Sequence, residues 1–187
     1  MTYSWYPPLC TARLTLRAIV AADRERHGEL FGDAAVVRYL YEEPLVGAAL
    51  DEHLLKRFWR GLPVDGGWCN LAVEREGEYV GEVGVGLTSV EHRQAEVGYV
   101  FLPRARGLGY ATEATRAMVD LAVVKLGAHR VVGRLDGRNV ASAAVLERLG
   151  LRREATFRQN EFVKGEWTDE VVYATLASEW TVTTAFD

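Results

Sequence analysis

The chain has 187 residues, of which 49% are hydrophobic and 26% charged, and its formal net charge is −4 at pH 7. These values are typical of a soluble globular protein of ordinary domain size, so we expect residues 1–187 to form a single domain. A weakly acidic chain has no overall attraction for nucleic acid or an anionic membrane, and we expect neither as a partner.

Cysteine and histidine usage argues against disulfide and metal sites. Cys10 and Cys69 are too few for a disulfide framework and lack metal-ligand spacing. No apolar stretch approaches membrane-spanning length, and the first ten residues lack a basic start followed by an apolar run. We therefore expect free thiols in a reducing cytoplasm. No metal is expected, because no ligand spacing joins the histidines, which are His27, His53, His92 and His129.

The first part of the chain predicts one strand and three helices. Leu14 and Leu16 alternate with polar residues, which is the period of a half-buried strand. Helical patterns follow at residues 23–31, 34–41 and 50–59, and the segment from Gly61 to Gly67 ends the last of them.

The second part predicts most of a sheet. Strands are expected at residues 70–74, 79–87, 95–102, 129–135, 154–162 and 168–176, with helices at 108–126 and 141–149. The strand, helix and strand from 95 to 135 predict a crossover that joins two parallel strands. The fold class is α/β (α+β), with a mixed, mostly antiparallel sheet of about seven strands and helices on both faces.

A glycine-bearing basic turn precedes the longest predicted helix. Gly107 and Gly109 leave the backbone open, and the first N–H groups of a helix lack internal partners, so the turn is typical of an anion site. Arg104 and Arg106 add positive charge that suits phosphate. A dinucleotide-binding turn is the alternative, but Thr112 takes its third small position and no acidic residue follows at the expected distance.

These residues resemble the GCN5-related N-acetyltransferase (GNAT) family, whose motif Gln/Arg-x-x-Gly-x-Gly/Ala stands here at Arg104–Gly109. The match continues, in the family's order, through residues 109–114, 139–142 and 145–150. Residues 158–167 resemble the RimJ/RimL group of ribosomal-protein N-terminal acetyltransferases. Together the matches extend across residues 14–176.

The resemblance implies acetyl-CoA as co-substrate, with its pyrophosphate on the turn and its pantetheine between the splayed strands 95–102 and 129–135. Backbone groups of three residues on the first strand would be free to bond the pantetheine, and one N–H near Phe101 would polarise the thioester carbonyl. The implied cofactor-binding residues are Val100, Phe101, Leu102, Arg104, Arg106, Gly107, Leu108, Gly109, Tyr110, Ala111, Asn139 and Ser142.

The chemistry needs a proton acceptor for the amine and a partner for the departing sulfur. Many family members use a tyrosine seven residues after the asparagine, where this chain has Leu146. The RimJ/RimL group instead has a serine, which matches Ser142 here. For the base, the resemblance favours Glu161 and then Glu96, and Glu82 on the neighbouring strand is a third candidate. Each of these could instead be a solvated strand glutamate. Three tryptophans could line the acceptor cleft, namely Trp59, Trp68 and Trp167.

The resemblance therefore predicts an enzyme that acetylates a primary amine, such as the N-terminal α-amine of a ribosomal protein. The alternatives are a small-molecule amine, such as an antibiotic or polyamine, and a non-catalytic CoA-binding module. A homodimer is possible by analogy with the RimJ/RimL group.

Overall fold

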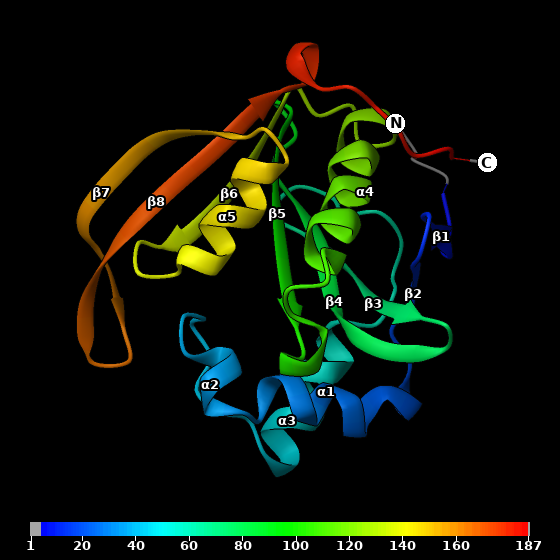
Figure 1. Ribbon diagram of the computed structural model, residues 1–187, viewed down its shortest axis with the longest axis vertical. Helices are drawn as coiled ribbons and strands as arrows, with labels where there is room; N and C mark the ends of the chain where they lie inside the picture. The colour runs from blue at the N-terminus through cyan, green and yellow to red at the C-terminus, as the bar shows by residue number, and fades with distance from the viewer. Residues whose placement is uncertain (1–4, 187) are drawn as a thin grey trace.

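The computed structural model describes residues 5–186 and consists of an open sheet with five α-helices (Figure 1). The strands are β1 (Leu9–Cys10), β2 (Thr15–Ala18), β3 (Trp68–Arg75), β4 (Glu78–Ser89), β5 (Gln94–Phe101), β6 (Arg130–Asp136), β7 (Arg152–Val163) and β8 (Glu166–Leu176). The helices are α1 (Arg24–Phe31), α2 (Ala34–Val37), α3 (Gly47–Lys56), α4 (Tyr110–Val124) and α5 (Val140–Arg148). None of these helices is long and apolar enough to cross a bilayer.

The sheet has the strand order β1-β2-β3-β4-β5-β6-β8-β7. All its pairings are antiparallel except that of β5 with β6, so the predicted parallel crossover through α4 is confirmed. The sheet has eight strands and not about seven, because β1 pairs with Leu16 and Thr15 of β2. A strand of two residues is too short to show an alternating pattern.

Helices cover both faces of the sheet, as predicted, and side-chain alternation along the strands explains why. On β3, Leu71 and Val73 belong to the large hydrophobic cluster under α4 and α5, whereas Ala72 belongs to a second cluster with residues of α1, α2 and α3. Figure 1 shows α1, α2 and α3 grouped below the sheet, well apart from α4 and α5. Because β3 is covered on both faces, its odd-numbered and its even-numbered positions both hold apolar side chains.

Two helix boundaries differ from the prediction. The helix expected at 34–41 is the single turn α2, after which Leu40 N–H bonds the Val37 carbonyl in a turn. The helix expected at 50–59 is α3, which begins earlier and ends at Lys56, because the Arg57 N–H already bonds the carbonyls of Leu54 and Leu55.

Strands β5 and β6 separate soon after they pair. Their parallel register covers Gln94–Glu96 against Arg130–Val132. Beyond it, β5 stays with β4 as far as Phe101, while β6 follows β8 as far as Asp136. The sheet therefore opens into a gap whose edges are backbone from β5 and β6.

Candidate active site

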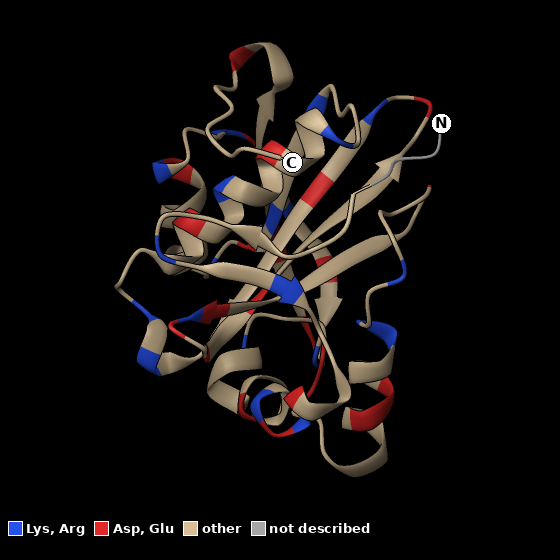
Figure 2. Ribbon diagram, turned by 90° about the vertical axis from the view of Figure 1, so that its right-hand side faces the viewer, with Lys and Arg blue, Asp and Glu red and all other residues tan. Residues whose placement is uncertain are grey.

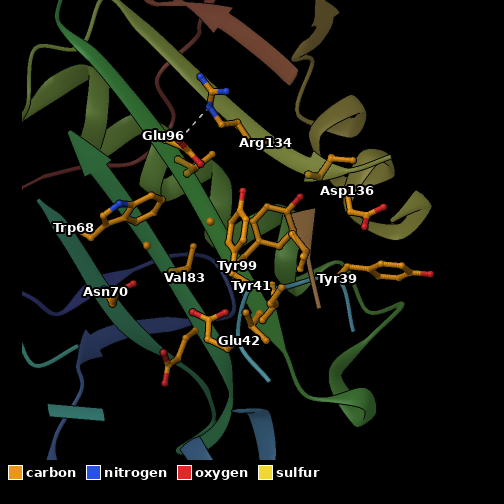
Figure 3. Close-up of a pocket in the computed structure, with 18 of the residues that line it drawn as sticks. Tyr39, Tyr41, Glu42, Trp68, Asn70, Val83, Glu96, Tyr99, Arg134 and Asp136 are labelled. Carbon is orange, nitrogen blue, oxygen red and sulfur yellow. Dashed lines mark ion pairs between the residues drawn. The ribbon is translucent and has the colours of Figure 1, made fainter. Parts of the chain in front are cut away.

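A pocket of about 570 Å³ lies where β5 and β6 diverge (Figure 3). Glycines hollow its floor on the face of the sheet that α1 and α3 cover. A Cβ at Gly84 would lie 2.6 Å from Asn70 Oδ1, and one at Gly86 would lie 2.4 Å from Trp68 Cε2. Without those side chains, the Trp68 ring can lie along the sheet as one wall of the pocket.

The other two candidate tryptophans lie elsewhere. Trp59 stacks edge-on with Trp5, at a ring-centroid distance of 5.5 Å. Trp167 is exposed on the β7–β8 hairpin, where its ring centroid is 5.2 Å from that of Phe162. Of the three predicted tryptophans, only Trp68 lines this pocket.

Glu96 lines the pocket at the last paired position before the strands separate. Burial raises the pKa of its carboxyl, and the charge of Glu170 raises it further, against the opposing charge of Arg134 on β6. The Arg134 Nε lies 3.4 Å from Glu96 Oε2, and its Nη1 donates to Glu170 Oε1 at 2.8 Å. A carboxyl with a raised pKa can both accept and hold a proton.

Glu161 reaches the same pocket through an irregularity in β7. The pairing of β7 with β8 shifts between Phe157 and Glu161, so that three residues of β7 stand opposite Asp169. Gln159 lies at the centre of this bulge with φ of 48°, and its N–H donates to Asp169 Oδ1 at 2.8 Å. The bulge re-aims the strand, which is a common use of such features near sites.

Glu82, the third candidate base, is 2% exposed, and its oxygens are already bonded. Oε1 lies 2.6 Å from His27 Nδ1 and accepts from Tyr79 Oη at 2.5 Å, while Oε2 accepts from Arg57 Nη1 at 3.2 Å. Burial opposes ionisation, but the hydrogen bond from His27 and the Arg57 charge outweigh it and lower the pKa. A carboxylate with this environment is a poor proton acceptor.

These contacts close into a ring of hydrogen bonds that continues through His53. His27 Nε2 lies 2.9 Å from His53 Nδ1, and Arg57 Nε donates to His53 Nε2 at 3.3 Å. All contacts are satisfied if each imidazole has one ring proton and the donors run Arg57 to His53, His53 to His27 and His27 to Glu82. The ring fixes Arg57, whose Nη1 also donates to Asn70 Oδ1 at 3.0 Å in the pocket floor.

Ser142 lies on the opposite face of the gap, in the first turn of α5. Asn139 is the N-cap of this helix, and its Oδ1 accepts from the Ser142 N–H at 3.1 Å. The Ser142 hydroxyl does not cap the helix, because its Oγ lies 2.8 Å from the hydroxyl of Tyr99 on β5. Sequence reasoning missed Tyr99, and a partner 43 residues away leaves no local pattern.

The glycine turn before α4 has the geometry of an anion site. Gly107 and Gly109 have φ of 76° and 81°, which L side chains rarely adopt. Gly109 is the N-cap of α4 and makes no side-chain capping bond. The first N–H groups of the helix, beginning at Tyr110, therefore point outward from its positive end.

The arginines of this turn have different surroundings. Arg104 is turned toward α1, where Nη1 donates to Glu29 Oε2 at 2.8 Å. Arg106 is exposed beside the glycines. Another guanidinium at this turn belongs to Arg13, whose Nη1 donates to the Leu108 carbonyl at 3.0 Å and whose Nε pairs with Glu113 at 2.7 Å. Arg13 was missed because it lies far upstream in the sequence.

The free backbone of β5 differs from the prediction. The Leu102 N–H donates to the Val80 carbonyl at 3.0 Å, so the expectation that it is free is wrong. The backbone N–H and C=O groups of successive residues point to alternate sides of a strand. Those of Val100 therefore also point to β4, whereas those of Tyr99 and Phe101 point into the gap. The backbone groups of Phe101 thus face the gap, as predicted. Those of Tyr99 also face it, in place of those of Val100 and Leu102.

Charged residues of both signs are spread over the strands and helices, without one dominant block (Figure 2). Within residues 5–186, no group of three or more His, Cys, Asp or Glu side chains has metal-site geometry. A glycine turn suited to an anion, a hydroxyl and carboxylates are the features expected of a transferase whose donor bears phosphate.

Residues 13–152 match the family model described as "Acetyltransferase (GNAT) domain", and the chain belongs to this family. The resemblance to the GCN5-related N-acetyltransferases is thereby confirmed. The chain is an N-acetyltransferase of a family that uses acetyl-CoA.

Curated relatives carry acetyltransferase names. Uncharacterized N-acetyltransferase p20 of Bacillus licheniformis is 25% identical over 92% of this chain and 97% of its own length. FsC-acetyl coenzyme A-N(2)-transacetylase of Aspergillus fumigatus is 31% identical over 96% of this chain and 80% of its own. Uncharacterized N-acetyltransferase YnaD of Bacillus subtilis is 35% identical over 46% of this chain, and the match spans half (50%) of that protein.

Solved structures share the fold. The GNAT-family acetyltransferase from Bacillus anthracis superposes with a TM-score of 0.82 at 28% identity, over 92% of this chain and all (100%) of the other. Mycobacterium smegmatis RimJ, in complex with CoA-disulfide, gives a TM-score of 0.77 at 22% identity, over 96% of this chain and 91% of that one. The second likeness concerns the fold alone.

Proposed function

We propose that the chain acetylates the N-terminal α-amine of a protein, in the manner of the RimJ/RimL group. The sequence support is Ser142, three residues after Asn139, together with residues 158–167, which contain Glu161. One observation carries the proposal: the gap between β5 and β6 has a hydroxyl pair on one face and carboxylates on the other.

Different segments of the chain would bind different parts of acetyl-CoA. The Gly107–Gly109 turn and the first N–H groups of α4 would bind the pyrophosphate, with Arg106 beside them. The backbone of Tyr99 and Phe101 would bond the pantetheine and polarise the thioester carbonyl. Acetyl-CoA supplies the activated acetyl group, and the side chains of this protein would handle the protons.

Glu96 is the proton acceptor that the electrostatics favour, because its pKa is raised by burial. Glu161, which the sequence favours, faces the same pocket and would attract the incoming ammonium. The ammonium loses one proton to water before it reacts. The neutral amine nitrogen then bonds the acetyl carbon and loses a second proton to the Glu96 carboxylate. The carbon–sulfur bond then breaks, its electron pair stays on sulfur, and the Ser142 hydroxyl donates a hydrogen bond to the thiolate.

A small-molecule amine is the second candidate acceptor. Seven carboxylates line the pocket against three Lys or Arg side chains, which suits a small cation. The Aspergillus fumigatus relative is named FsC-acetyl coenzyme A-N(2)-transacetylase, and that name specifies acetyl transfer to an N(2) nitrogen. The lining carboxylates are Glu42, Glu82, Glu96, Asp136, Glu161, Asp169 and Glu170, and the cations are Lys56, Arg57 and Arg134.

A thiol-release assay separates these readings. Purified protein is given acetyl-CoA with a panel of peptides that differ in their N-terminal residue, and in parallel with a panel of small mono-, di- and polyamines. We expect turnover with the peptides. Turnover with the small amines alone would replace the protein acceptor by the second candidate. The third alternative, a non-catalytic CoA-binding module, would take up CoA in calorimetry but turn over neither panel. A chain that takes up no CoA has no part in acetyl transfer.

A further inference from the structure

The Tyr99 hydroxyl makes two contacts with one residue of α5. Its Oη lies 2.8 Å from Ser142 Oγ and 2.9 Å from the Ser142 carbonyl oxygen. Tyr99 comes from β5, at the edge of the gap, and also lines the pocket (Figure 3). The tyrosine therefore stands between the acceptor pocket and the serine.

Counting hydrogens shows what this contact controls. Each hydroxyl has one hydrogen, and the carbonyl can only accept. If Tyr99 donates to the carbonyl, Ser142 donates to Tyr99 and has no hydrogen for a ligand. If Tyr99 donates to Ser142 Oγ, the serine hydrogen is free to point into the gap. The pair thus has two arrangements, and a thiolate in the gap selects the second.

Burial supports a role for Tyr99 as a permanent donor. Desolvation raises the pKa of Tyr99 to about 12, so the phenol keeps its hydrogen at neutral pH. Position 146, where many family members have their tyrosine, holds a leucine that is 1% exposed and packs against Gly133 of β6. A Cβ at Gly133 would lie 2.6 Å from Leu146 Cδ1, so the β6 side of the gap is filled.

We propose that Tyr99 is the positioning residue for Ser142: it donates to Oγ and directs the serine hydrogen to the departing sulfur. The inference rests on the proposed function. No proton leaves Tyr99. The carbon–sulfur electron pair becomes the thiolate, Ser142 donates a hydrogen bond to it, and the thiolate takes its proton from solvent after release. Without Tyr99, nothing fixes the rotation of the serine hydroxyl, and its hydrogen is no longer directed to the sulfur.

The test is a double-mutant cycle in the thiol-release assay, using Tyr99→Phe, Ser142→Ala and the double variant. Tyr99→Phe should lower kcat by roughly fivefold to tenfold, the worth of one hydrogen bond, and leave KM for acetyl-CoA unchanged. The double variant should be no slower than Ser142→Ala, because both changes remove the same interaction. Equal rates for Tyr99→Phe and wild type, or losses that multiply, would overturn the inference.

Tyr173→Phe is the matched control. Tyr173 is a buried tyrosine whose hydroxyl donates to Glu147 of the same helix at 2.8 Å, outside the pocket. If Tyr99 merely anchored α5, the two Phe variants would behave alike, and the inference would fail. We expect Tyr173→Phe to keep the wild-type kcat.

A second readout does not depend on turnover. The pKa of the thiol of bound CoA, followed by thiolate absorbance, should rise in both Tyr99→Phe and Ser142→Ala, because a hydrogen bond to the thiolate is lost. An unchanged thiol pKa in Tyr99→Phe would overturn the inference even if the variant were slow. Failure of the proposed function looks different, since the wild type would then turn over neither the peptide nor the amine panel.

Discussion

Oε1 of Glu82 lies 2.6 Å from Nδ1 of His27, and both side chains are almost completely removed from solvent. Glu82 is on β4 and His27 is on α1, so the pair ties the helical layer to the sheet. The ring through His53 and Arg57 makes this contact part of the pocket floor. A buried carboxylate of this kind stabilises the fold only while all its donors are present.

Glu82→Gln should lower the free energy of unfolding by about 3 kcal/mol, because an amide cannot satisfy the donors that face both carboxylate oxygens. Urea unfolding at neutral pH measures the change. Glu29→Gln is the control, since Glu29 pairs with exposed Arg104 and should cost less than about 1 kcal/mol. A loss for Glu82→Gln no larger than that of the control would contradict the ring.

The same variant has a defined pH dependence. The pKa of Glu82 is lower in the folded than in the unfolded protein, so the unfolded state binds more protons as the pH falls. The stability from Glu82 is therefore complete above the ordinary carboxyl pKa and is lost as the pH falls through the folded value. The difference in free energy of unfolding between wild type and Glu82→Gln should therefore shrink in that acid range. A difference that grew there would contradict a lowered pKa of Glu82.

Arg106 and Arg104 form a second matched pair. Arg106 is exposed beside the glycine turn, whereas Arg104 is paired with Glu29. Arg106→Ala should raise the Kd for CoA about tenfold at low salt, and less at high salt because the ions screen the charge. Arg104→Ala should change the Kd by less than about twofold. Isothermal titration calorimetry measures both, and a larger effect of Arg104→Ala would reverse the assignment.

Local features of the site could be predicted from sequence, and long-range ones could not. The glycine turn, the long helix and the crossover lie within one short stretch, so their order and spacing were enough. Tyr99 and Ser142 are 43 residues apart and Arg13 and Glu113 are 100 apart, and neither pair leaves a periodic pattern. The wrong prediction of a free Leu102 N–H has the same origin, because which backbone groups of a strand are free depends on its register with the neighbouring strand.

Glu96 sets the expected pH profile of catalysis. Its pKa is raised by burial, so the acid limb of kcat/KM should lie above the ordinary carboxyl range. Arg134→Gln removes the charge that lowers this pKa and should move the limb to higher pH. Glu96→Gln should lower kcat/KM by about a hundredfold and abolish the limb.

The control for that series is Arg130→Gln. Arg130 is also on β6 but pairs with Glu154, away from the pocket. Its pH profile should match that of the wild type. A limb that survives in Glu96→Gln but disappears in Glu161→Gln would make Glu161 the proton acceptor.

Gly86 tests whether the Trp68 wall shapes the acceptor pocket. A Cβ at Gly86 would lie 2.4 Å from the indole ring, a separation that forces the ring to move. Gly86→Ala should therefore raise KM for the amine several-fold, about what one lost aromatic contact is worth, and leave the Kd for CoA unchanged. Tryptophan fluorescence should report the displaced ring.

Gly98→Ala is the matched change on β5, because its Cβ would lie 3.5 Å from the same ring, an ordinary contact. It should leave the tryptophan spectrum as in the wild type. If Gly86→Ala moved the ring without changing KM for the amine, the acceptor would bind away from Trp68. The amine would then have to approach Glu96 from the β6 side of the pocket, past Arg134.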